Sequence, residues 1–440
     1  MALRLDTGSW IVGVLHNRLG EGITKRGTGL SVRREELGLR SETVRRSNLS
    51  AIARELHAGG PLSRSKLGAC TGLTRSAIRA LIGEFAAAGL VSEEPSAPLG
   101  GPGRPSSLVY PLGEAAVGLA LEIAVDSLSA AVVGFGGQVL ELIKIDSPRG
   151  EMSVERVVAE LTELAHEVRG LAPARPELVG IGVGVVGVVR RSDGFVSMAP
   201  NLGWRDVPLG QALRQSFATS MPIFVANEAD LGALAELRRG AARGHRNVIF
   251  ISGEVGVGGG LIVDGRPLTG VSGYSGEIGH MPMSSVGAAC RCGSVGCWET
   301  EIGENALLSL AGHSGEGGRE AVQSVVREAA RGSAAALSAL EQVGMGLGRG
   351  LAGLVNALNP ELILLGGLFG RIYDYVSPIV DRQLDRYALP AARQAVQLAP
   401  AALSEDASLF GAGELAMEPF LADPAEWLRP RSAVLELAGA

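Results

Sequence analysis

The stretch GEIGHMPMSSVGAACRCGSVGCWET, from Gly276 to Thr300, carries most of the information in this sequence. It contains His280 and three of the four cysteines of the chain, Cys290, Cys292 and Cys297. Glycines between these cysteines let the backbone turn back sharply, so that three sulfur atoms can face one point. Three thiolates and one imidazole form the closed tetrahedral ligand set of a structural zinc site. We therefore predict that these four residues bind one zinc ion.

Three unlinked buried thiols, or a disulfide, are the alternatives, but the short spacing and the lack of a secretory leader argue against both. The same stretch places Glu277 three residues before His280, and Glu299 two residues after the last cysteine. If one ring nitrogen of His280 binds zinc, the metal fixes the tautomer and the other nitrogen faces a pocket. Carboxylates beside such an imidazole suit the recognition of vicinal hydroxyls, which predicts a sugar site braced by the metal.

GEIGH at 276–280 and CRCGSVGCWE at 290–299 resemble the two signatures of the ROK family of bacterial repressors, sugar kinases and open reading frames. The glycine spacing of 256–280 resembles the longer family pattern. This resemblance covers 113–440 and implies an α/β, two-lobed, actin-like domain of the sugar kinase and ribonuclease H-like type. It implies a small lobe at about 113–225 plus the C-terminal helix, and a large lobe at about 226–404. It also implies a sugar in the cleft between the lobes, bound by Asn201, Asn227, Glu228, Glu277, His280 and Glu299.

The charge of the chain is divided between its two parts. Residues 1–112 carry 15 Lys and Arg against 9 Asp and Glu, whereas the remainder carries 25 against 37. A basic head on an acidic body is typical of a nucleic-acid-binding module joined to a second domain. The sequence contains no apolar run of 18 residues and no leader with a cleavage site, which predicts a soluble cytoplasmic protein without a membrane partner.

The head begins with a Gly- and Arg-rich segment, 1–40, which we expect to be a flexible arm, or an over-extended start of the reading frame. A basic arm that contacts DNA is the alternative. From 41 to 112 the pattern predicts a winged helix-turn-helix. Apolar residues from Leu49 to Leu56 have helical spacing, and Ser63 and Thr74 are N-caps of two further helices. Short strands at 90–91 and 108–110 surround a Gly- and Pro-rich tip.

The third helix of such a head enters the major groove with its N-terminal residues on the base edges. Arg75, Ser76 and Arg79 lie opposite its apolar face and are the predicted DNA contacts. The tip GGPGRPSS at 100–107 places Arg104 where it can lie in an A·T-rich minor groove, although the tip can equally be a flexible linker. The alternative for the whole head is a protein–protein module with a solvated helix face. A homodimer or homotetramer would match a two-fold operator.

Three departures from the kinase pattern concern ATP. Family kinases open their first hairpin with an Asp-x-Gly-x-Thr turn, whereas 122–127 reads EIAVDS, with bulky Val125 in the turn. They carry Asn-Asp-Ala-Asn with the Asp as base, whereas this chain has Asn-Glu-Ala-Asp with Glu228, whose extra methylene displaces the carboxylate by about an ångström. Glu254 adds a negative charge where a triphosphate would lie.

These departures predict a sugar-responsive transcriptional regulator, a repressor rather than an activator, with no catalytic residue and Glu228 as a degenerate base. The alternative is an ATP-dependent sugar kinase with an accessory DNA-binding head.

Overall fold

The computed structural model describes residues 32–95, 107–147, 153–172, 178–314 and 317–428. The predictions for the N-terminal arm before Val32 and for Arg104 in the tip therefore fall outside the described residues. Two compact units divide the chain, 1–45 and 46–440, and the first contributes the beginning of helix α1. Within the described ranges, no helix has the length and apolarity needed to cross a membrane.

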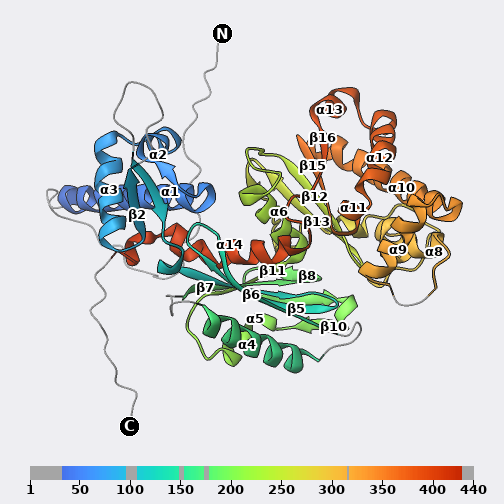
Figure 1. Cartoon of the computed structure of the whole chain (residues 1–440), viewed down its shortest axis with the longest axis horizontal. Coiled ribbons are helices and arrows are strands. Elements are labelled where there is room, and N and C mark those ends of the chain that lie inside the picture. Colours follow the sequence, from blue (N-terminus) through green and yellow to red (C-terminus); the bar gives the residue numbers. More distant parts are fainter. Residues whose placement is uncertain (1–31, 96–106, 148–152, 173–177, 315–316, 429–440) are drawn as a thin grey trace, which may run out of the picture. The chain divides into compact units, whose positions relative to one another are not determined.

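Three helices and a three-stranded antiparallel sheet form the head (Figure 1). The sheet has the order β1-β3-β2, and β1 was not expected from the sequence. Helix α1 already begins at Val32, before the predicted boundary of the head at 41. The elements are α1 (Val32–Gly59), β1 (Leu62–Ser63), α2 (Arg64–Thr71), α3 (Arg75–Ala87), β2 (Val91–Pro95) and β3 (Ser107–Pro111).

Local sequence signals account for the ends of α2 and α3. The Ser63 hydroxyl accepts a hydrogen bond from the Lys66 backbone N–H, and the Thr74 hydroxyl accepts one from that of Ala77, so both helices have the predicted N-caps. Gly72 ends α2 in the left-handed conformation, at φ 71°. The buried side chains of α3 are those that its helical period predicts, namely Ile78, Leu81, Ile82 and Phe85.

The small lobe is built on a five-stranded sheet of order β11-β7-β4-β5-β6, in which β11, β7 and β4 run parallel. Helix α4 covers one face of this sheet, and α14 covers the other. The approach of α14 is very close, because a Cβ on Gly182 would lie 2.0 Å from the carbonyl oxygen of Ala412. The elements are β4 (Val117–Ile123), β5 (Ser127–Gly134), β6 (Val139–Asp146), α4 (Val154–Leu171), β7 (Leu178–Val185), β11 (Ile223–Asn227) and α14 (Ala407–Ala422).

A second small sheet lies between β7 and β11 in the sequence and was not predicted. Its order is β10-β9-β8, and the 3-10 turn η2 (Pro200–Leu202) inside it carries Asn201. Helix α5 precedes β11 and packs against α4. The elements are β8 (Val188–Arg190), β9 (Phe195–Ala199), β10 (Trp204–Val207) and α5 (Leu209–Ser216).

The large lobe holds the other five-stranded sheet, of order β14-β13-β12-β15-β16, with β12, β15 and β16 parallel. Helix α10 ends at Leu358 and β15 begins at Leu362. The strands are β12 (Val248–Gly253), β13 (Val257–Val263), β14 (Arg266–Pro267), β15 (Leu362–Gly366) and β16 (Gln397–Pro400). The helices are α7 (Glu299–Ile302), α8 (Glu304–Leu310), α9 (Arg319–Ala330), α10 (Ala334–Leu358), α11 (Gly367–Arg371), α12 (Tyr373–Tyr387) and α13 (Pro390–Ala395).

Two helices fill the space between the two large sheets (Figure 1). Helix α6 (Glu228–Arg239) follows β11 and packs on β12 and β13 of the large lobe. Helix α14 packs on β4 and β7 of the small lobe, and the two helices pack on each other. This is the mixed α/β, two-lobed architecture predicted for 113–440, and it leaves the ends of β4, β11 and β12 facing a common cleft.

Candidate functional site

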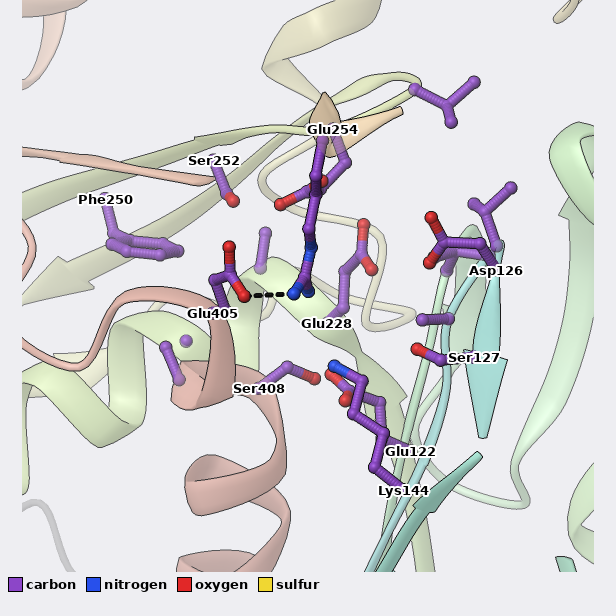
Figure 2. A pocket seen from close by; sticks show the side chains of 18 residues that line it. Glu122, Asp126, Ser127, Lys144, Glu228, Phe250, Ser252, Glu254, Glu405 and Ser408 are labelled. Carbon is purple, nitrogen blue, oxygen red and sulfur yellow. Dashed lines mark ion pairs between the residues drawn. The ribbon is translucent and has the colours of Figure 1, made fainter. Parts of the chain in front are cut away.

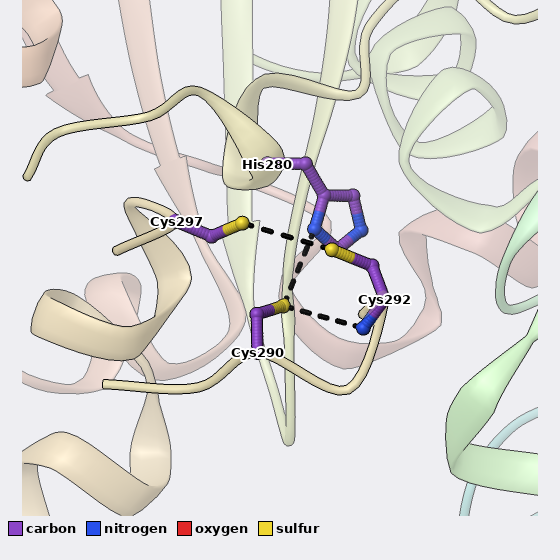
Figure 3. Close-up of side chains that lie close together, drawn as sticks. All are labelled: His280, Cys290, Cys292 and Cys297. Carbon is purple, nitrogen blue, oxygen red and sulfur yellow. Dashed lines mark hydrogen bonds between the residues drawn. The ribbon is translucent and has the colours of Figure 1, made fainter. Parts of the chain in front are cut away.

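The four predicted metal ligands come together in the structure. One ligand atom from each of His280, Cys290, Cys292 and Cys297 lies within 4.8 Å of the others. Figure 3 shows the imidazole of His280 and the three thiol groups arranged around one point. Nδ1 of His280 lies 3.7 Å from Sγ of Cys290, and the sulfur atoms of Cys292 and Cys297 are also 3.7 Å apart. All four cysteines of the chain are free.

These distances fit a tetrahedral cation. With Zn–S bonds of about 2.3 Å, two sulfur ligands of a tetrahedron are about 3.8 Å apart. A disulfide needs about 2.05 Å, so Cys292 and Cys297 are not linked. Burial raises the pKa of the Cys290 and Cys297 thiols, so the ligand set needs a bound cation to become thiolate. The structure therefore contains a candidate metal site of three sulfurs and one imidazole.

Two short bridges and a buried tryptophan hold the loop that carries the three cysteines, which we call the metal loop. Pro282 pairs with Cys297, and Ala289 with Val295, as isolated antiparallel bridges. Trp298, which follows the last ligand, is fully buried and donates its indole N–H to the carbonyl of Gly346 on α10. The metal loop is thus fixed to the core of the large lobe directly beside a ligand.

Two carboxylates connect the metal cluster to the cleft. Oε1 of Glu299 lies 2.7 Å from Sγ of Cys290 and 3.7 Å from Nδ1 of His280. Its Oε2 accepts a hydrogen bond from the backbone N–H of Val257. Glu277 faces the other ring nitrogen of His280, with 4.0 Å between Oε2 and Nε2. His280 therefore turns one edge to the cysteines and the other to the cleft.

The cleft is open to solvent. Both lobes line it, since Val186 and Asn201 come from the small lobe and Gly256 from the β12–β13 turn of the large lobe. A concave site with a few convergent polar groups is typical of small-molecule binding. All six residues predicted to bind sugar lie on its wall: Asn201, Asn227, Glu228, Glu277, His280 and Glu299.

Both the oxygen and the nitrogen of the Asn227 side-chain amide form hydrogen bonds with the backbone. Its Oδ1 accepts from the backbone N–H groups of Ala229 and Asp230, which caps helix α6, and its Nδ2 donates to the carbonyl of Gly187. Asn227 therefore positions the first turn of α6, including Glu228. A ligand in the cleft can meet this amide through the second N–H of Nδ2, which makes no hydrogen bond to the described residues.

Arg291 is a cleft residue that the sequence analysis missed. It lies between two metal ligands in the sequence, and its guanidinium donates to Oδ1 of Asn201 at 2.6 Å. This contact joins the metal loop of the large lobe to η2 of the small lobe. No local signal in the sequence indicates this contact, because Asn201 lies 90 residues away from Arg291.

A second pocket, of about 680 Å³, adjoins the cleft at the β4–β5 turn. Figure 2 shows Glu122, Glu228, Glu254 and Glu405 around it, with Lys144 near Glu122. Val125 lines both spaces and is 8% exposed. The lining carries five carboxyl groups, from the four glutamates and Asp126, against two cations, Lys144 and Arg319. Those of the carboxyl groups that are ionised oppose the binding of a polyphosphate.

Burial and mutual repulsion keep part of these carboxyl groups protonated. Burial, followed by the charges of Glu122 and Glu254, raises the pKa of Glu228 to about 8. Burial raises the pKa of Glu254 to about 7, against the opposing charges of Arg371 and Arg319. Burial also raises the pKa of Glu122 and of Glu277. At neutral pH the cleft can thus donate hydrogen bonds from carboxyl groups as well as accept them.

In the head, the predicted DNA contacts lie on the solvent side of α3. Arg75, Ser76 and Arg79 are exposed, and Ile78 and Ile82 on the same helix are buried. The hydroxyl of Ser76 lies 3.1 Å from that of Thr74, the N-cap residue. The exposed face of α3 therefore presents two guanidinium groups from its first two turns.

The sequence of this chain was compared with those of known proteins and protein families. The model of the ROK family matches residues 118–418. A xylose repressor of Bacillus spizizenii is 29% identical over 381 residues, which are 86% of this chain and 97% of the repressor. A glucokinase of Halalkalibacterium halodurans is 34% identical over 266 residues, which are 57% of this chain and 80% of the kinase.

Among solved structures, a ROK family transcriptional regulator, a homologue of the Escherichia coli Mlc protein, superimposes with a TM-score of 0.71. It is 25% identical and covers 88% of this chain and 99% of its own. The xylose repressor and this regulator align over more of the chain than the part from 118 to the C-terminus can supply. Both alignments therefore extend into the head.

Proposed function

Since the chain belongs to the ROK family, whose model spans residues 118–418, we propose that it is a sugar-responsive, DNA-binding transcriptional repressor. One observation carries this proposal: the head, with its exposed arginines on α3, lies in the part of the chain that the xylose repressor and the regulator structure share with it. The glucokinase aligns over only 57% of the chain. A repressor works where its DNA is, so a cytoplasmic location accompanies the proposal.

The head is proposed to act as a winged helix-turn-helix. Its helix α3 would lie in the major groove, with Arg75 and Arg79 able to contact guanine through two hydrogen bonds each, and Ser76 beside them. Arg104, which lies outside the described residues, is proposed to contact the minor groove from the tip. A homodimer or homotetramer would place two such heads on a two-fold operator.

The cleft is proposed to bind the effector, a small sugar or sugar phosphate. Glu277, His280 and Glu299 would bind its hydroxyl groups from the large lobe, and Asn201 from the small lobe. Glu228, at the start of α6, and Asn227, which caps that helix, complete the site. Because the ligand would touch both lobes, it prefers one arrangement of them, which is the requirement for a ligand-controlled switch.

The metal is proposed to be a structural zinc ion bound by His280, Cys290, Cys292 and Cys297. Zinc favours a tetrahedral set of sulfur and nitrogen ligands with no open position. When bound, it would supply no chemistry beyond fixing the loop. By fixing the loop, the ion would keep Glu277 and Glu299 in position at the cleft wall.

A sugar kinase with an accessory DNA-binding head is the second candidate, and the glucokinase at 34% identity favours it. Against it, we propose that the kinase site is degenerate. Val125 fills the β4–β5 turn, the pocket beside it carries an excess of carboxyl groups, and Glu228 replaces the shorter aspartate that family kinases use as base.

The decisive experiment measures operator affinity with and without sugar. A duplex enriched by the wild-type protein from a random-sequence library serves as operator, and the sugars are D-xylose, D-glucose and their phosphates. We expect one of them to weaken DNA binding by roughly 5–150-fold. Glu277→Ala should lose this response and keep its sugar-free affinity for DNA. Glu301→Ala is the matched control, because Glu301 pairs with Arg349 away from the cleft wall.

A wild-type protein that selects no duplex, or that ignores every sugar in the panel, would contradict the proposed function. A Glu277→Ala protein that responds at wild-type sugar concentrations would instead place the effector site elsewhere.

A further inference from the structure

Helix α6 reaches from the cleft to the head. Its first residue, Glu228, lies on the cleft wall, and its last residue, Arg239, contacts α1 of the head. Twelve residues of α-helix span about 18 Å. A single rigid element therefore touches both places that a repressor has to couple.

The guanidinium of Arg239 binds three elements at once. Its Nε donates to Oε1 of Glu414 on α14 at 2.5 Å. One terminal nitrogen donates to the carbonyl of His57 on α1 at 3.2 Å and to that of Gly136, in the β5–β6 turn, at 3.1 Å. The side chain of Arg239 is 18% exposed, whereas those of His57 and Glu414 are almost completely buried. The charge of Arg239 is thus committed to a buried junction of head, small lobe and α6.

His57 completes this junction. The backbone N–H of Gly136 donates to its Nδ1 at 3.1 Å. Its Nε2 lies 2.9 Å from the second terminal nitrogen of Arg239 and 3.3 Å from Oε2 of Glu414. Both oxygens of Glu414 are therefore engaged, one by α6 and the other by the head. Any displacement of Arg239 leaves a buried carboxylate without its cation, which is costly.

The β5–β6 turn is shaped to receive the guanidinium. Gly137 has φ 76°, and a Cβ at this position would lie 1.7 Å from Cζ of Arg239. Only a residue without a side chain leaves room for the guanidinium against the turn. The close fit means that the turn cannot follow a moving Arg239 without changing its own contacts to His57.

The packing of α6 makes it a lever between the lobes. On the large-lobe side, a Cβ on Gly260 of β13 would lie 2.4 Å from the carbonyl oxygen of Ala229. On the small-lobe side, a Cβ on Gly411 of α14 would lie 2.0 Å from the carbonyl oxygen of Leu231. Leu231 is three residues from Glu228 and eight from Arg239, about 4.5 Å and 12 Å along the axis. A rotation of α6 about this contact therefore displaces Arg239 farther than it displaces Glu228.

Resting on the proposed function, we propose that α6 is the lever that couples the cleft to the head, and that Arg239 is its positioning residue. Closure of the lobes on a sugar rotates α6 against α14. The hydrogen bonds of Arg239 to His57 and Glu414 then change. The head itself is fixed to α14 by other contacts, such as the Arg54–Glu418 ion pair and the hydrogen bond from Ser50 to the carbonyl of Leu421. Arg239 supplies a contact of the head with α6.

The test removes the lever contact without leaving an unpaired charge. In Arg239→Met combined with Glu414→Gln, the side chains keep similar volumes, and the Gln amide can still form a hydrogen bond with Nε2 of His57. The matched control is Arg54→Met combined with Glu418→Gln, which removes a pair between α1 and α14 that does not involve α6. Operator affinity is measured with and without the sugar that acts on wild type, and sugar affinity by calorimetry. Circular dichroism confirms folding.

We expect the Arg239 double variant to bind the operator and the sugar within about threefold of wild type, while the sugar changes its DNA affinity less than about twofold. The control keeps the wild-type change, which lies in the usual range of about 5–150-fold. Arg239→Lys, which keeps the ion pair but not the forked contacts, should retain part of the response. If the double variant fails to fold, Arg239→Lys is the variant that tests the inference.

Two outcomes would overturn the inference while leaving the proposed function standing. One is a wild-type response in the Arg239 variants, and the other is an equal loss in the Arg54 control. A wild-type protein without any sugar response overturns the proposed function and the inference together.

Discussion

The imidazole of His280 faces the carboxylate of Glu277, with Nε2 and Oε2 4.0 Å apart. The other nitrogen of the same ring lies among the cysteine sulfurs. A cation bound there would be held through the lone pair of that nitrogen, and the ring proton would then lie on the nitrogen that faces Glu277. The metal cluster and the proposed effector site are therefore not independent, because one side chain belongs to both.

We predict that the purified protein contains about one zinc ion per chain and that Cys292→Ser loses it. Because the loop that carries Glu277 and Glu299 would no longer be held, the variant should also lose its response to sugar. Loss of a structural metal should lower the midpoint of thermal unfolding by at least about 5 °C. Elemental analysis and a thermal melt check both points.

Cys70→Ser is the control, since Cys70 is the fourth cysteine and is exposed on α2. It should change neither the metal content nor the melting midpoint. A metal-free protein that stays folded and responds to sugar would sink the prediction.

How far the sequence predicts the structure depends on how local each signal is. The caps Ser63 and Thr74, and the glycine after α2, act within one helical turn and are visible in a single chain. The metal cluster is also local, since three ligands fall within eight residues. Strand β1 has only two residues, too few for an alternating pattern, and its partner β3 lies more than 40 residues away.

Contacts between distant segments were beyond the reach of the sequence. Nothing near His57 indicates that it meets Arg239, 182 residues along the chain, or Glu414, which lies another 175 residues beyond Arg239. Asn227 was predicted as a sugar ligand from the family pattern, and its role as the cap of α6 emerged only from the hydrogen bonds. Arg291 was missed because its partner Asn201 lies in the other lobe.

We predict that the protein does not transfer phosphate from ATP to D-xylose or D-glucose. The bulky side chain of Val125 occupies the β4–β5 turn, and the carboxyl groups of Glu122 and Glu254 beside it repel a triphosphate to the extent that they are ionised. For the same reason Glu228→Asp, which restores the shorter base, should not restore activity. A coupled assay for ADP release measures both. Sugar-dependent turnover above background that Glu228→Gln abolishes would contradict this prediction and favour the kinase.

We predict that Arg75→Ala and Arg79→Ala each weaken operator binding by about 1–3 kcal/mol and relax specificity at one base pair. The physical reason is the loss of a guanidinium that can make two hydrogen bonds to guanine. Arg75→Lys and Arg79→Lys are the matched controls, because they keep the charge but lose the forked geometry. They should keep the salt dependence of binding and lose the specificity. Unchanged affinity in both alanine variants would move the DNA contact to another surface of the head.

The last prediction concerns Asp230 on α6, which is 5% exposed. Its Oδ2 has no hydrogen-bond partner among the described residues. Burial raises the pKa of this carboxyl to about 7, although the charge of Arg191 opposes the shift. In the Asn-Asp-Ala-Asn pattern of family kinases, an asparagine stands at the position of Asp230. Asp230→Asn therefore replaces a buried acid with the uncharged side chain of that pattern.

The sign of the effect follows from proton binding. The folded protein holds the Asp230 proton up to about pH 7, whereas the unfolded chain releases it near pH 4, so this contribution to stability is present below pH 4 and is lost as the pH rises to about 7. Asp230→Asn cannot titrate. We therefore expect the variant to gain stability relative to wild type between pH 5 and pH 8, by up to about 4 kcal/mol. Other buried carboxyl groups, including those of Glu228 and Glu254, titrate in both proteins and cancel in the difference.

Thermal melts of wild type and Asp230→Asn at pH 5 and pH 8 provide the measurement. Asp146→Asn, at the exposed end of β6, controls for the removal of one carboxylate in general. If Asp230→Asn is destabilised equally at both pH values, the carboxyl is needed as a carboxylate by the first turns of α6. In that case Asp230 would stay charged in the folded protein, and Arg191 would be its counter-ion.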